Sequence, residues 1–271
     1  MKKCDCPLCK FENPRITATA VIIKNQKILV AKRNEEPFKG QWDFWGGYVQ
    51  KNETPEQGLK REIKEELGVA CNAILIGSFT GTATFKDYKF PVLSFAYLTE
   101  LKGEPKLNKE ENSKLAWVPI KSIKTIAFDS NLKILKFIKD KFIFDLAKVK
   151  KLINQLDPNA VFSEQSLYKA MFNGYIAKVE EKGKLLGIGW IFPRQTILRR
   201  QAVVEDMIVD ESQRGKGLGE KILLDLIGWA KKQGVEVVEL TTNPKRIAAN
   251  ALYQKVGFKL HPTNHYLLNL R

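Results

Sequence analysis

The segment GYVQKNETPEQGLKREIKEELGV, which begins at Gly47, contains a helix whose two ends are marked by the sequence itself. Thr54 is a typical N-cap, and the proline after it is a typical first helical residue. Gln57 lies three residues after Thr54, so the two side chains can form a capping box. Because Gly68 is typical of a helix C-terminus, the pattern predicts a helix from about 55 to 67.

This predicted helix concentrates negative charge next to a glycine loop. Its apolar face repeats every four residues, at Leu59, Ile63 and Leu67. Glu62 and Glu66 stack one turn apart with Glu65 beside them, although like charges at this spacing destabilise an isolated helix by roughly 0.2–0.5 kcal/mol per pair. The crowding indicates a hard divalent cation, Mg²⁺ or Mn²⁺. The alternative is a solvated acidic face that Lys60 and Lys64 partly neutralise.

The spacing of fixed residues in this segment resembles the sequence box of the Nudix hydrolases, without a gap or a mismatch. Gly47 and Glu53 open the box, and REIKEELGV at 61–69 closes it. Upstream, ITATAVIIKNQKILVAKR predicts two strands around a turn, and downstream AWVPI at 116–120 predicts a strand followed by a closing helix. Trp45 departs from the family pattern, because many relatives have proline before the double glycine.

The resemblance implies metal-dependent hydrolysis of a nucleoside diphosphate linked to another group, with cleavage inside the diphosphate. Metals that bridge phosphate oxygens lower the pKa of a bound water and neutralise developing charge. Arg61 would hold the glutamates in place, and Glu53 would anchor the loop. A glycine of the pair 46–47 could add a backbone carbonyl. The expected metal ligands are Gly47, Glu62, Glu65, Glu66 and Glu111, and the expected catalytic residues are Glu62, Glu65 and Glu111.

The assignment of Glu111 rests on its position six residues before Trp117, where relatives often carry an acidic residue. Glu110 is adjacent, and the alternative is that the segment KLNKEENSK is a solvated loop. ADP-ribose and oxidised nucleoside triphosphates are the candidate substrates of this half.

The second half carries an independent pattern. AVVEDMIVD at 202–210 predicts a buried strand, which leads into the glycine-rich turn RGKGLG at 214–219 and an apolar-periodic helix. Glycines in such a turn let backbone N–H groups converge at a helix N-terminus, which suits a diphosphate. Further elements are predicted as a strand at 235–243, a helix at 246–258 and a strand at 265–270.

This order of elements resembles the GNAT superfamily of acetyltransferases over roughly 145–271. The resemblance implies that acetyl-CoA is bound and that an amine attacks its thioester directly, with no covalent enzyme intermediate. The loop 213–219 would cradle the pyrophosphate, and the backbone near 207–209 would pair with the pantetheine arm. Tyr253 is the expected general acid and Glu205 a candidate base, although Glu205 could be an ordinary polar residue at a strand end. The expected cofactor-binding residues are Met207, Ile208, Val209, Gln213, Arg214, Gly215, Lys216, Gly217, Leu218, Gly219, Asn243, Asn250 and Tyr253.

Length and motifs together predict two domains of mixed α+β and α/β class. Residues 1–13 form a cysteine-containing segment, 14–143 a Nudix-type α/β/α sandwich with a mixed sheet, and 144–271 a GNAT-type mixed sheet flanked by helices. The sequence therefore predicts a bifunctional enzyme, a nucleotide pyrophosphohydrolase joined to an N-acetyltransferase. One alternative is that one domain is a catalytically silent ligand-binding module. Another is an RNA-processing or RNA-modifying factor.

Charge bears on the expected partners. The chain has 45 Lys and Arg against 30 Asp and Glu, a net charge of +15. A positive field favours capture of anionic ligands, so the expected partners are a nucleotide substrate and an amine acceptor that meets acetyl-CoA. Nucleic acid is the weaker alternative, since no aromatic RNA-binding motif and no lysine block occur. No apolar run is long enough to span a bilayer, so no membrane partner is expected.

The cysteines indicate the compartment and a further metal. Cys6 and Cys9 have zinc-knuckle spacing and Cys4 lies close by, which would suit Zn²⁺ in a remnant ribbon or in a site completed by another chain. The basic start lacks an apolar core and is not expected to act as a signal peptide. Clustered cysteines without a disulfide scaffold favour the cytoplasm, and Cys71 is expected in a core.

Overall fold

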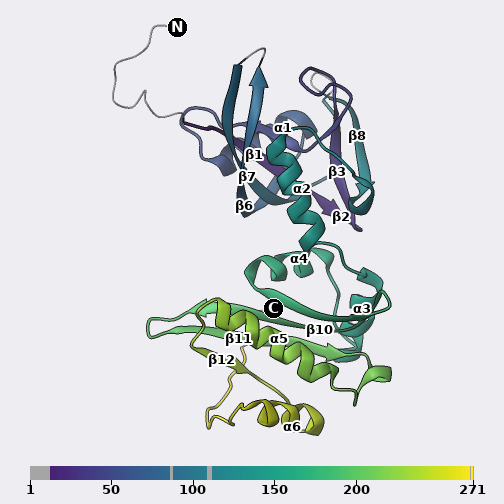
Figure 1. The fold of residues 1–271 in the computed structure, drawn as a ribbon, viewed down its shortest axis with the longest axis vertical. Coiled ribbons are helices and arrows are strands. Elements are labelled where there is room, and N and C mark those ends of the chain that lie inside the picture. The colour runs from purple at the N-terminus through teal and green to yellow at the C-terminus, as the bar shows by residue number, and fades with distance from the viewer. Residues whose placement is uncertain (1–12, 86–87, 109–111, 269, 271) are drawn as a thin grey trace. The chain divides into compact units, whose positions relative to one another are not determined.

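The computed structural model describes residues 13–85, 88–108, 112–268 and 270, and the chain divides into two compact units, Met1–Phe144 and Asp145–Arg271 (Figure 1). The described elements of the first unit are β1 (Arg15–Val21), β2 (Ile23–Lys24), β3 (Lys27–Arg33), β4 (Trp42–Asp43), β5 (Trp45–Tyr48), α1 (Pro55–Leu67), β6 (Ala70–Phe85), β7 (Tyr88–Lys102), β8 (Asn112–Pro119), η2 (Ile120–Ser122) and α2 (Asp129–Lys141).

The first unit is built on a mixed sheet in the order β5-β1-β7-β6. β1 pairs antiparallel with β5 and parallel with β7, and β7 pairs antiparallel with β6. A further sheet joins β2, β3 and β4, with β8 antiparallel on β3. Asn25 and Gln26 have positive φ at the tight turn between β2 and β3, where a turn is expected.

Helices cover both faces of the mixed sheet. Phe95 and Tyr97 of β7 pack in the core beside α1, so Ser94, the residue before Phe95, faces the other way. Phe79 of β6 pairs with Ser94, and its ring lies 5.6 Å from that of Phe137 in α2. α1 and α2 therefore lie on opposite faces, and the expected α+β class is confirmed for this unit.

The expected helix at 55–67 is confirmed as α1. Thr54 Oγ1 accepts a hydrogen bond from Gln57 N at 3.3 Å, and Thr54 N donates to Gln57 Oε1 at 2.8 Å, which completes the capping box. Gly68 ends the helix with φ +68°. The apolar face formed by Leu59, Ile63 and Leu67 is fully buried between the two sheets. This packing fixes the neighbouring, carboxylate-bearing face of α1 next to β5.

The second unit contains one mixed sheet in the order β12-β11-β10-β9, in which only the β11–β12 pairing is parallel among the described strands. Its described elements are α3 (Leu146–Leu156), α4 (Glu164–Asn173), β9 (Tyr175–Glu181), β10 (Lys184–Gln195), β11 (Arg200–Val209), η3 (Glu211–Gln213), α5 (Leu218–Lys232), β12 (Val237–Leu240) and α6 (Ile247–Val256).

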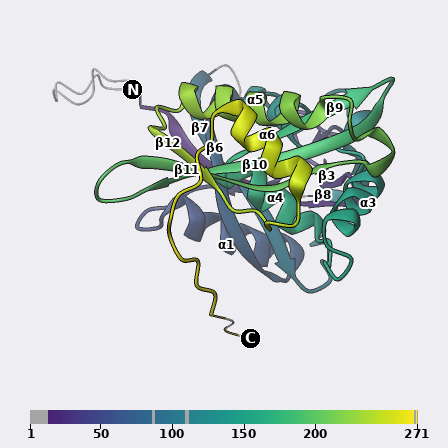
Figure 2. The same cartoon turned by 90° about the horizontal axis from the view of Figure 1, so that it is seen from below.

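The two faces of this sheet carry different helices (Figure 2). Ala177 and Ile191 share a core with Ile222 of α5. Side chains alternate along β10, so Ile188 and Trp190 face the opposite side, where α3 and α4 pack. Helices thus flank a mixed sheet in this unit as well, as the sequence predicts.

β11 contains an irregularity that matters for the site. Its register with β10 shifts opposite Gly189, where β11 carries the two residues Asp206 and Met207, so the strand forms a β-bulge. Asp206 lies in the left-handed region, with φ +49°. Pairing with β12 stops at Val204, and the remainder of β11 has no strand on that side among the described residues.

The strand predicted at 265–270 is wrong. Residues 259–268 form no strand, and the side chains of Tyr266, Leu267 and Leu268 are exposed. An alternating apolar pattern supplies strand propensity, but a strand also requires a partner for its backbone hydrogen bonds, and this segment has none within the described chain. Among the helices that the structure describes, none has both the length and the apolar character needed to cross a bilayer.

Candidate functional sites

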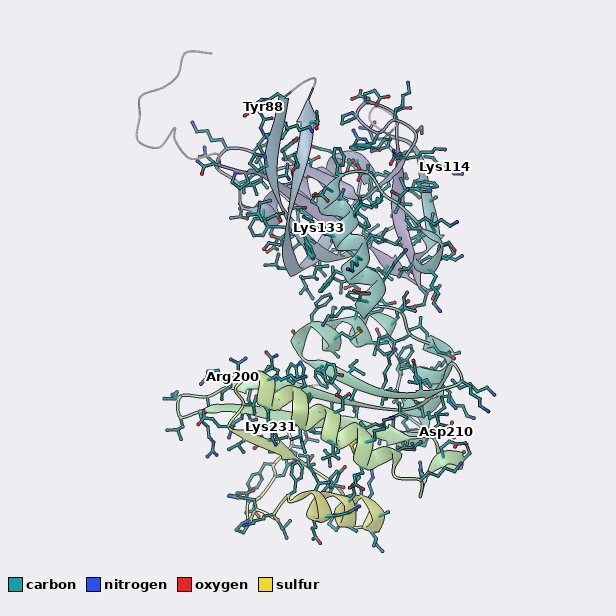
Figure 3. All side chains as sticks on the ribbon, viewed as in Figure 1. Tyr88, Lys114, Lys133, Arg200, Asp210 and Lys231 are labelled. Atoms are coloured by element: carbon teal, nitrogen blue, oxygen red, sulfur yellow. The ribbon has the colours of Figure 1, made fainter. Side chains whose placement is uncertain are left out.

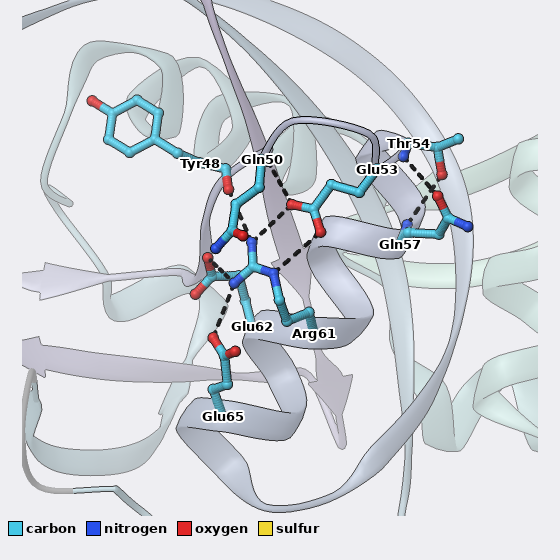
Figure 4. A network of polar contacts seen from close by, with 8 residues as sticks. All are labelled: Tyr48, Gln50, Glu53, Thr54, Gln57, Arg61, Glu62 and Glu65. Carbon is cyan, nitrogen blue, oxygen red and sulfur yellow. Dashed lines mark hydrogen bonds and ion pairs between the residues drawn. The ribbon is translucent and has the colours of Figure 1, made fainter.

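Arg61 on α1 donates hydrogen bonds to three carboxylates of the first unit (Figure 4). Its Nε and Nη2 donate to the two oxygens of Glu53 at 3.1 and 2.8 Å, and Nη2 also donates to the Tyr48 carbonyl at 3.1 Å. Its Nη1 donates to Glu62 Oε1 and Glu65 Oε2, both at 2.9 Å. The hydrogen bond from Arg61 lowers the pKa of Glu53, and Glu53 is the main cause of the raised pKa of Arg61. Arg61 therefore ties the loop before α1 to the carboxylates on α1.

The double glycine of β5 lies directly against two of these carboxylates. A Cβ on Gly47 would lie 2.6 Å from Glu62 Oε1, so only glycine leaves room for this carboxylate. Gly46 N donates to Glu66 Oε2 at 2.9 Å, and Asn112 Nδ2 donates to Glu66 Oε1 at 3.1 Å. Glu66 is thus oriented by one backbone and one side-chain donor. Asn112 was not expected from the sequence, since it is 46 residues from Glu66.

The donor set fits a hard cation, because carboxylate and carbonyl oxygens are the ligands that Mg²⁺ and Mn²⁺ prefer. Within the described ranges, however, no three His, Cys, Asp or Glu side chains are grouped so as to hold a metal ion. Arg61 binds one oxygen each of Glu62 and Glu65. A cation at these residues would compete with Arg61 for the same oxygens.

Some expected ligands lie outside the described residues. Glu111 is one of them, so its proximity to the α1 carboxylates stays a prediction. Cys4, Cys6 and Cys9 also lie outside, and no finding supports the zinc expectation. Cys71 is buried in the core of the first unit, as expected.

A cavity of about 460 Å³ opens beside Gly46 and Gly47, and we call it the substrate cavity. Its walls include the aromatic rings of Tyr48, Phe90 and Phe128, together with polar residues such as Arg33 and Asp43. Trp45, which replaces the proline of many relatives, is fully buried in the core and also lines this cavity. Gly46 and Gly47 line this cavity and lie against Glu66 and Glu62, so the cavity suits a ligand with one anionic and one aromatic end.

A buried polar cluster lies in the wall of the substrate cavity. Asp43 Oδ2 accepts from Arg33 Nη1 at 3.0 Å, and Asp43 Oδ1 accepts from Asn131 Nδ2 at 2.7 Å and from Phe44 N at 2.9 Å. Burial raises the pKa of Asp43 to about 6, although Arg33 and these hydrogen bonds oppose the shift. Sequence reasoning missed this cluster, because its members come from β3, β4 and α2 and no short motif joins them.

In the second unit, the glycine-rich turn leads directly into α5. Gly215 and Gly217 have φ of +79° and +76°, a region that favours glycine, and Gly217 is the N-cap of α5 without a side-chain cap. A Cβ at either glycine would meet no atom within 4 Å, so the backbone conformation and not crowding explains these residues. The first N–H groups of α5 thus point out of the helix as potential donors to an anion.

Asp210 lies between the end of β11 and this turn (Figure 3). Its contacts were not expected from the sequence. It is buried, accepts from Ser212 N at 3.1 Å and Ser212 Oγ at 2.7 Å, and forms an ion pair with Lys148 of α3. The hydrogen bond from Lys148 is the main cause of its lowered pKa. Within the turn, Arg214 Nε donates to the Val209 carbonyl at 3.2 Å, and Lys216 Nζ to Gln213 Oε1 at 2.8 Å.

A cavity of about 470 Å³, which we call the transfer cavity, lies where β11 and β12 diverge. Glu205, Met207, Asn243 and Tyr253 all line it, so four of the expected residues come together. Burial raises the pKa of Tyr253, which keeps its hydroxyl protonated. Burial also raises the pKa of Glu205, and the neighbouring Asp206 adds to that shift, while His265 opposes it.

The remaining expected residues lie apart from this cavity. Asn250 Nδ2 donates to the carbonyls of Asn243 and Arg246 at 3.1 and 3.0 Å, so Asn250 supports the loop that presents Asn243. Ile208 is buried and Gly219 packs against Leu252. Asp206, which sequence reasoning passed over, lines the transfer cavity beside Glu205.

Comparison with known proteins adds two family matches. The NUDIX domain matches residues 13–141, and the Acetyltransferase (GNAT) family matches residues 146–258. An ADP-ribose pyrophosphatase of Methanocaldococcus jannaschii is 30% identical over 131 residues, 48% of this chain and 74% of that protein. An 8-oxo-dGTP diphosphatase of Proteus vulgaris is 37% identical over 93 residues, 33% of this chain and 79% of that protein. An L-2,4-diaminobutyric acid acetyltransferase of Virgibacillus pantothenticus is 32% identical over 120 residues, 43% of this chain and 74% of that protein.

Proposed function

The chain belongs to two enzyme families, the NUDIX family through residues 13–141 and the GNAT acetyltransferase family through residues 146–258, and on this premise we propose that both units are catalytically active. The first unit would hydrolyse a nucleoside diphosphate linked to another group. The second would transfer an acetyl group from acetyl-CoA to an amine.

The observation that best supports hydrolysis is the fit of Glu62 against Gly47 at the edge of the substrate cavity. Glu62, Glu65 and Glu66 would hold Mg²⁺ or Mn²⁺ with the Gly47 carbonyl, and Glu111 would join them from outside the described residues. When bound, the metal polarises the diphosphate and lowers the pKa of an attacking water. Arg61 would hold the carboxylates together and oriented, and the aromatic walls of the cavity would hold the nucleoside.

The names of the relatives direct the choice of nucleotide. The M. jannaschii relative is named for ADP-ribose, and the P. vulgaris relative is named for an oxidised guanine nucleotide, 8-oxo-dGTP. We propose that the substrate of this chain is of one of these two classes. A panel that contains both, assayed with Mg²⁺ and a phosphate or nucleotide-monophosphate readout, tests the proposal, and no turnover of either would contradict it.

For acetyl transfer, the support comes from the glycine turn at the N-terminus of α5 and from the cavity on the open side of β11 that Glu205 and Tyr253 line. The turn 213–219 would bind the pyrophosphate of acetyl-CoA, and the backbone of 207–209 the pantetheine arm. Glu205 would accept a proton from the acceptor ammonium. The amine nitrogen then bonds to the thioester carbonyl carbon, the C–S bond breaks, and the leaving thiolate takes the proton of Tyr253. The new amide nitrogen loses its remaining extra proton, which restores the Tyr253 hydroxyl.

A calorimetric titration with acetyl-CoA, followed by an amine panel with a thiol readout, tests this second activity. We expect acetyl-CoA to bind with one site per chain and free thiol to appear only when a suitable amine is present. Absence of acetyl-CoA binding would refute the transferase proposal without touching the hydrolase proposal.

A further inference from the structure

The second unit contains another cavity, on the face of the sheet opposite α5, which we call the apolar cavity. It measures about 210 Å³ and lies among α3, α4, β9 and β10. Its walls are largely apolar and include Val149, Ile153, Leu167, Ile176 and Trp190. Apolar cavities of roughly 150 Å³ bind benzene in other proteins, so this volume can accommodate one aromatic ring with a short linker.

Two of the polar groups in these walls are already used within the protein. Trp190 Nε1 donates to the Ala170 carbonyl at 2.8 Å. The Ser163 hydroxyl caps α4 by accepting from Ser166 N at 3.2 Å. These groups are therefore poor partners for a polar ligand, and the interior favours an apolar one.

Asp206 connects the apolar cavity with the transfer cavity, since its side chain lines both. It lies on the β-bulge, where the left-handed backbone departs from the regular strand. The Asp206 side chain has no hydrogen bond or ion pair with any described residue of the chain. A carboxylate beside Glu205 and without a cation favours a positively charged ligand at this point.

The inference rests on the proposed transferase activity. We propose that the apolar cavity binds the body of the acetyl acceptor, an amine on an aromatic or branched aliphatic group, and that Asp206 binds its ammonium at the passage to the transfer cavity. An amino acid is a poor acceptor in this arrangement, because its α-carboxylate would lie near Asp206 and Glu205. A sugar amine is also disfavoured, because its hydroxyls would lose hydrogen bonds to water in an apolar cavity.

The experiment uses the full chain and 2-phenylethylamine as the probe, with phenylalanine and glucosamine as comparison amines. Binding is measured by titration calorimetry without acetyl-CoA, and transfer by thiol release with it. We expect 2-phenylethylamine to bind and to be acetylated with a kcat/KM at least tenfold above that of either comparison amine.

The variant Asp206→Asn tests the ammonium contact, since asparagine tolerates the left-handed backbone at this position. We expect at least a tenfold loss of 2-phenylethylamine affinity with unchanged acetyl-CoA affinity. The matched control is Asp225→Asn on α5, which removes a carboxylate that lines neither cavity. It should bind the amine as the wild type does.

A second variant, Ser166→Leu, narrows the apolar cavity and should weaken 2-phenylethylamine more than propylamine. No binding of 2-phenylethylamine, or equal binding by wild type and Asp206→Asn, would overturn the inference. Acetylation of glucosamine in preference to 2-phenylethylamine would also overturn it and would leave the transferase activity standing. Amine binding that depends on Asp206 without any acetyl-CoA binding would support the cavity assignment and refute the transferase.

Discussion

Replacement of Gly47 by alanine should move the Glu62 carboxylate while the stability of the fold changes little. The added Cβ would lie 2.6 Å from Glu62 Oε1 and 2.8 Å from its carboxyl carbon, whereas ordinary contacts begin at 3.4 Å. The Glu62 carboxylate must therefore move by about 0.8 Å. It can do so, because it is the end of a flexible side chain, and Gly47 itself has no positive φ that would strain alanine.

Stability should change little in Gly47→Ala, by less than about 1 kcal/mol. Catalysis should suffer, because a misplacement of about 1 Å at a reacting centre can reduce the rate about 100-fold, which equals about 2.7 kcal/mol in the barrier. We expect hydrolysis to fall by about 10- to 100-fold with Mg²⁺ saturating. The assay compares initial rates on ADP-ribose or an oxidised guanine nucleotide, whichever the wild type hydrolyses, with thermal unfolding measured on the same samples.

Gly46→Ala provides the matched comparison. Its Cβ would lie 2.1 Å from the Ala18 carbonyl oxygen of β1, and Gly46 has φ +120°, so this change should disrupt the β1–β5 pairing and lower stability by several kcal/mol. A wild-type hydrolysis rate in Gly47→Ala would refute the placement of Glu62 in the active site. Equal loss of stability in both variants would refute the geometric reasoning.

Four further outcomes are expected. Glu66→Gln should reduce hydrolysis by about 100-fold or more and leave acetyl-CoA titrations unchanged, since one preorganised charge contact contributes about 3 kcal/mol to barrier lowering; an unchanged rate would remove Glu66 from the site. Gly217→Asp should abolish acetyl-CoA binding in calorimetry, while Gly217→Asn, which tolerates the same φ without a charge, should only weaken it; equal affinity in all three would mean that the turn does not bind the pyrophosphate. Tyr253→Phe should bind acetyl-CoA normally but release thiol more slowly, and full activity would assign the proton to another donor. Burial raises the pKa of Asp43 in the folded state from 3.8 to about 6. Its contribution to the free energy of unfolding is therefore present below pH 4, and about 3 kcal/mol is lost as the pH rises through 6. Urea unfolding should show this loss of stability with rising pH in the wild type but not in Asp43→Asn, and the same pH dependence in both proteins would contradict the assignment.

The parts of the fold that the sequence predicts well are those with local signals. α1 begins and ends where its capping box and Gly68 place it, because each signal involves residues within one turn of the helix. The prediction of a strand at 265–270 is wrong because a strand also needs a partner from a distant part of the chain. Its pattern is local, but strand formation depends on a distant edge that the described chain does not bring to it.

In the candidate sites too, contacts within one short segment are predictable from the sequence, and contacts between distant segments are not. The carboxylates around Arg61 share one helix and one adjoining loop, so a short pattern contains all of them. Asp43 and Asn131 lie 88 residues apart, and Asn112 reaches Glu66 from another strand. Contacts of this kind depend on how β3, β4, β8 and α2 assemble, so a single sequence offers no spacing that would reveal them.

The amide of Gln26 defines how far an excised first unit has to extend. Gln26 Nε2 donates to the Phe142 carbonyl at 2.9 Å, and Phe144 N donates to Gln26 Oε1 at 3.1 Å, so the turn between β2 and β3 clamps the chain just after α2. Phe142 is fully buried, and loss of such a ring typically destabilises a protein by about 3–5 kcal/mol. A fragment that stops at residue 141, where the family match ends, would lack the buried Phe142 ring and would leave the Gln26 side-chain amide without these two backbone partners. A fragment that is meant to contain the whole first unit therefore has to include Phe144.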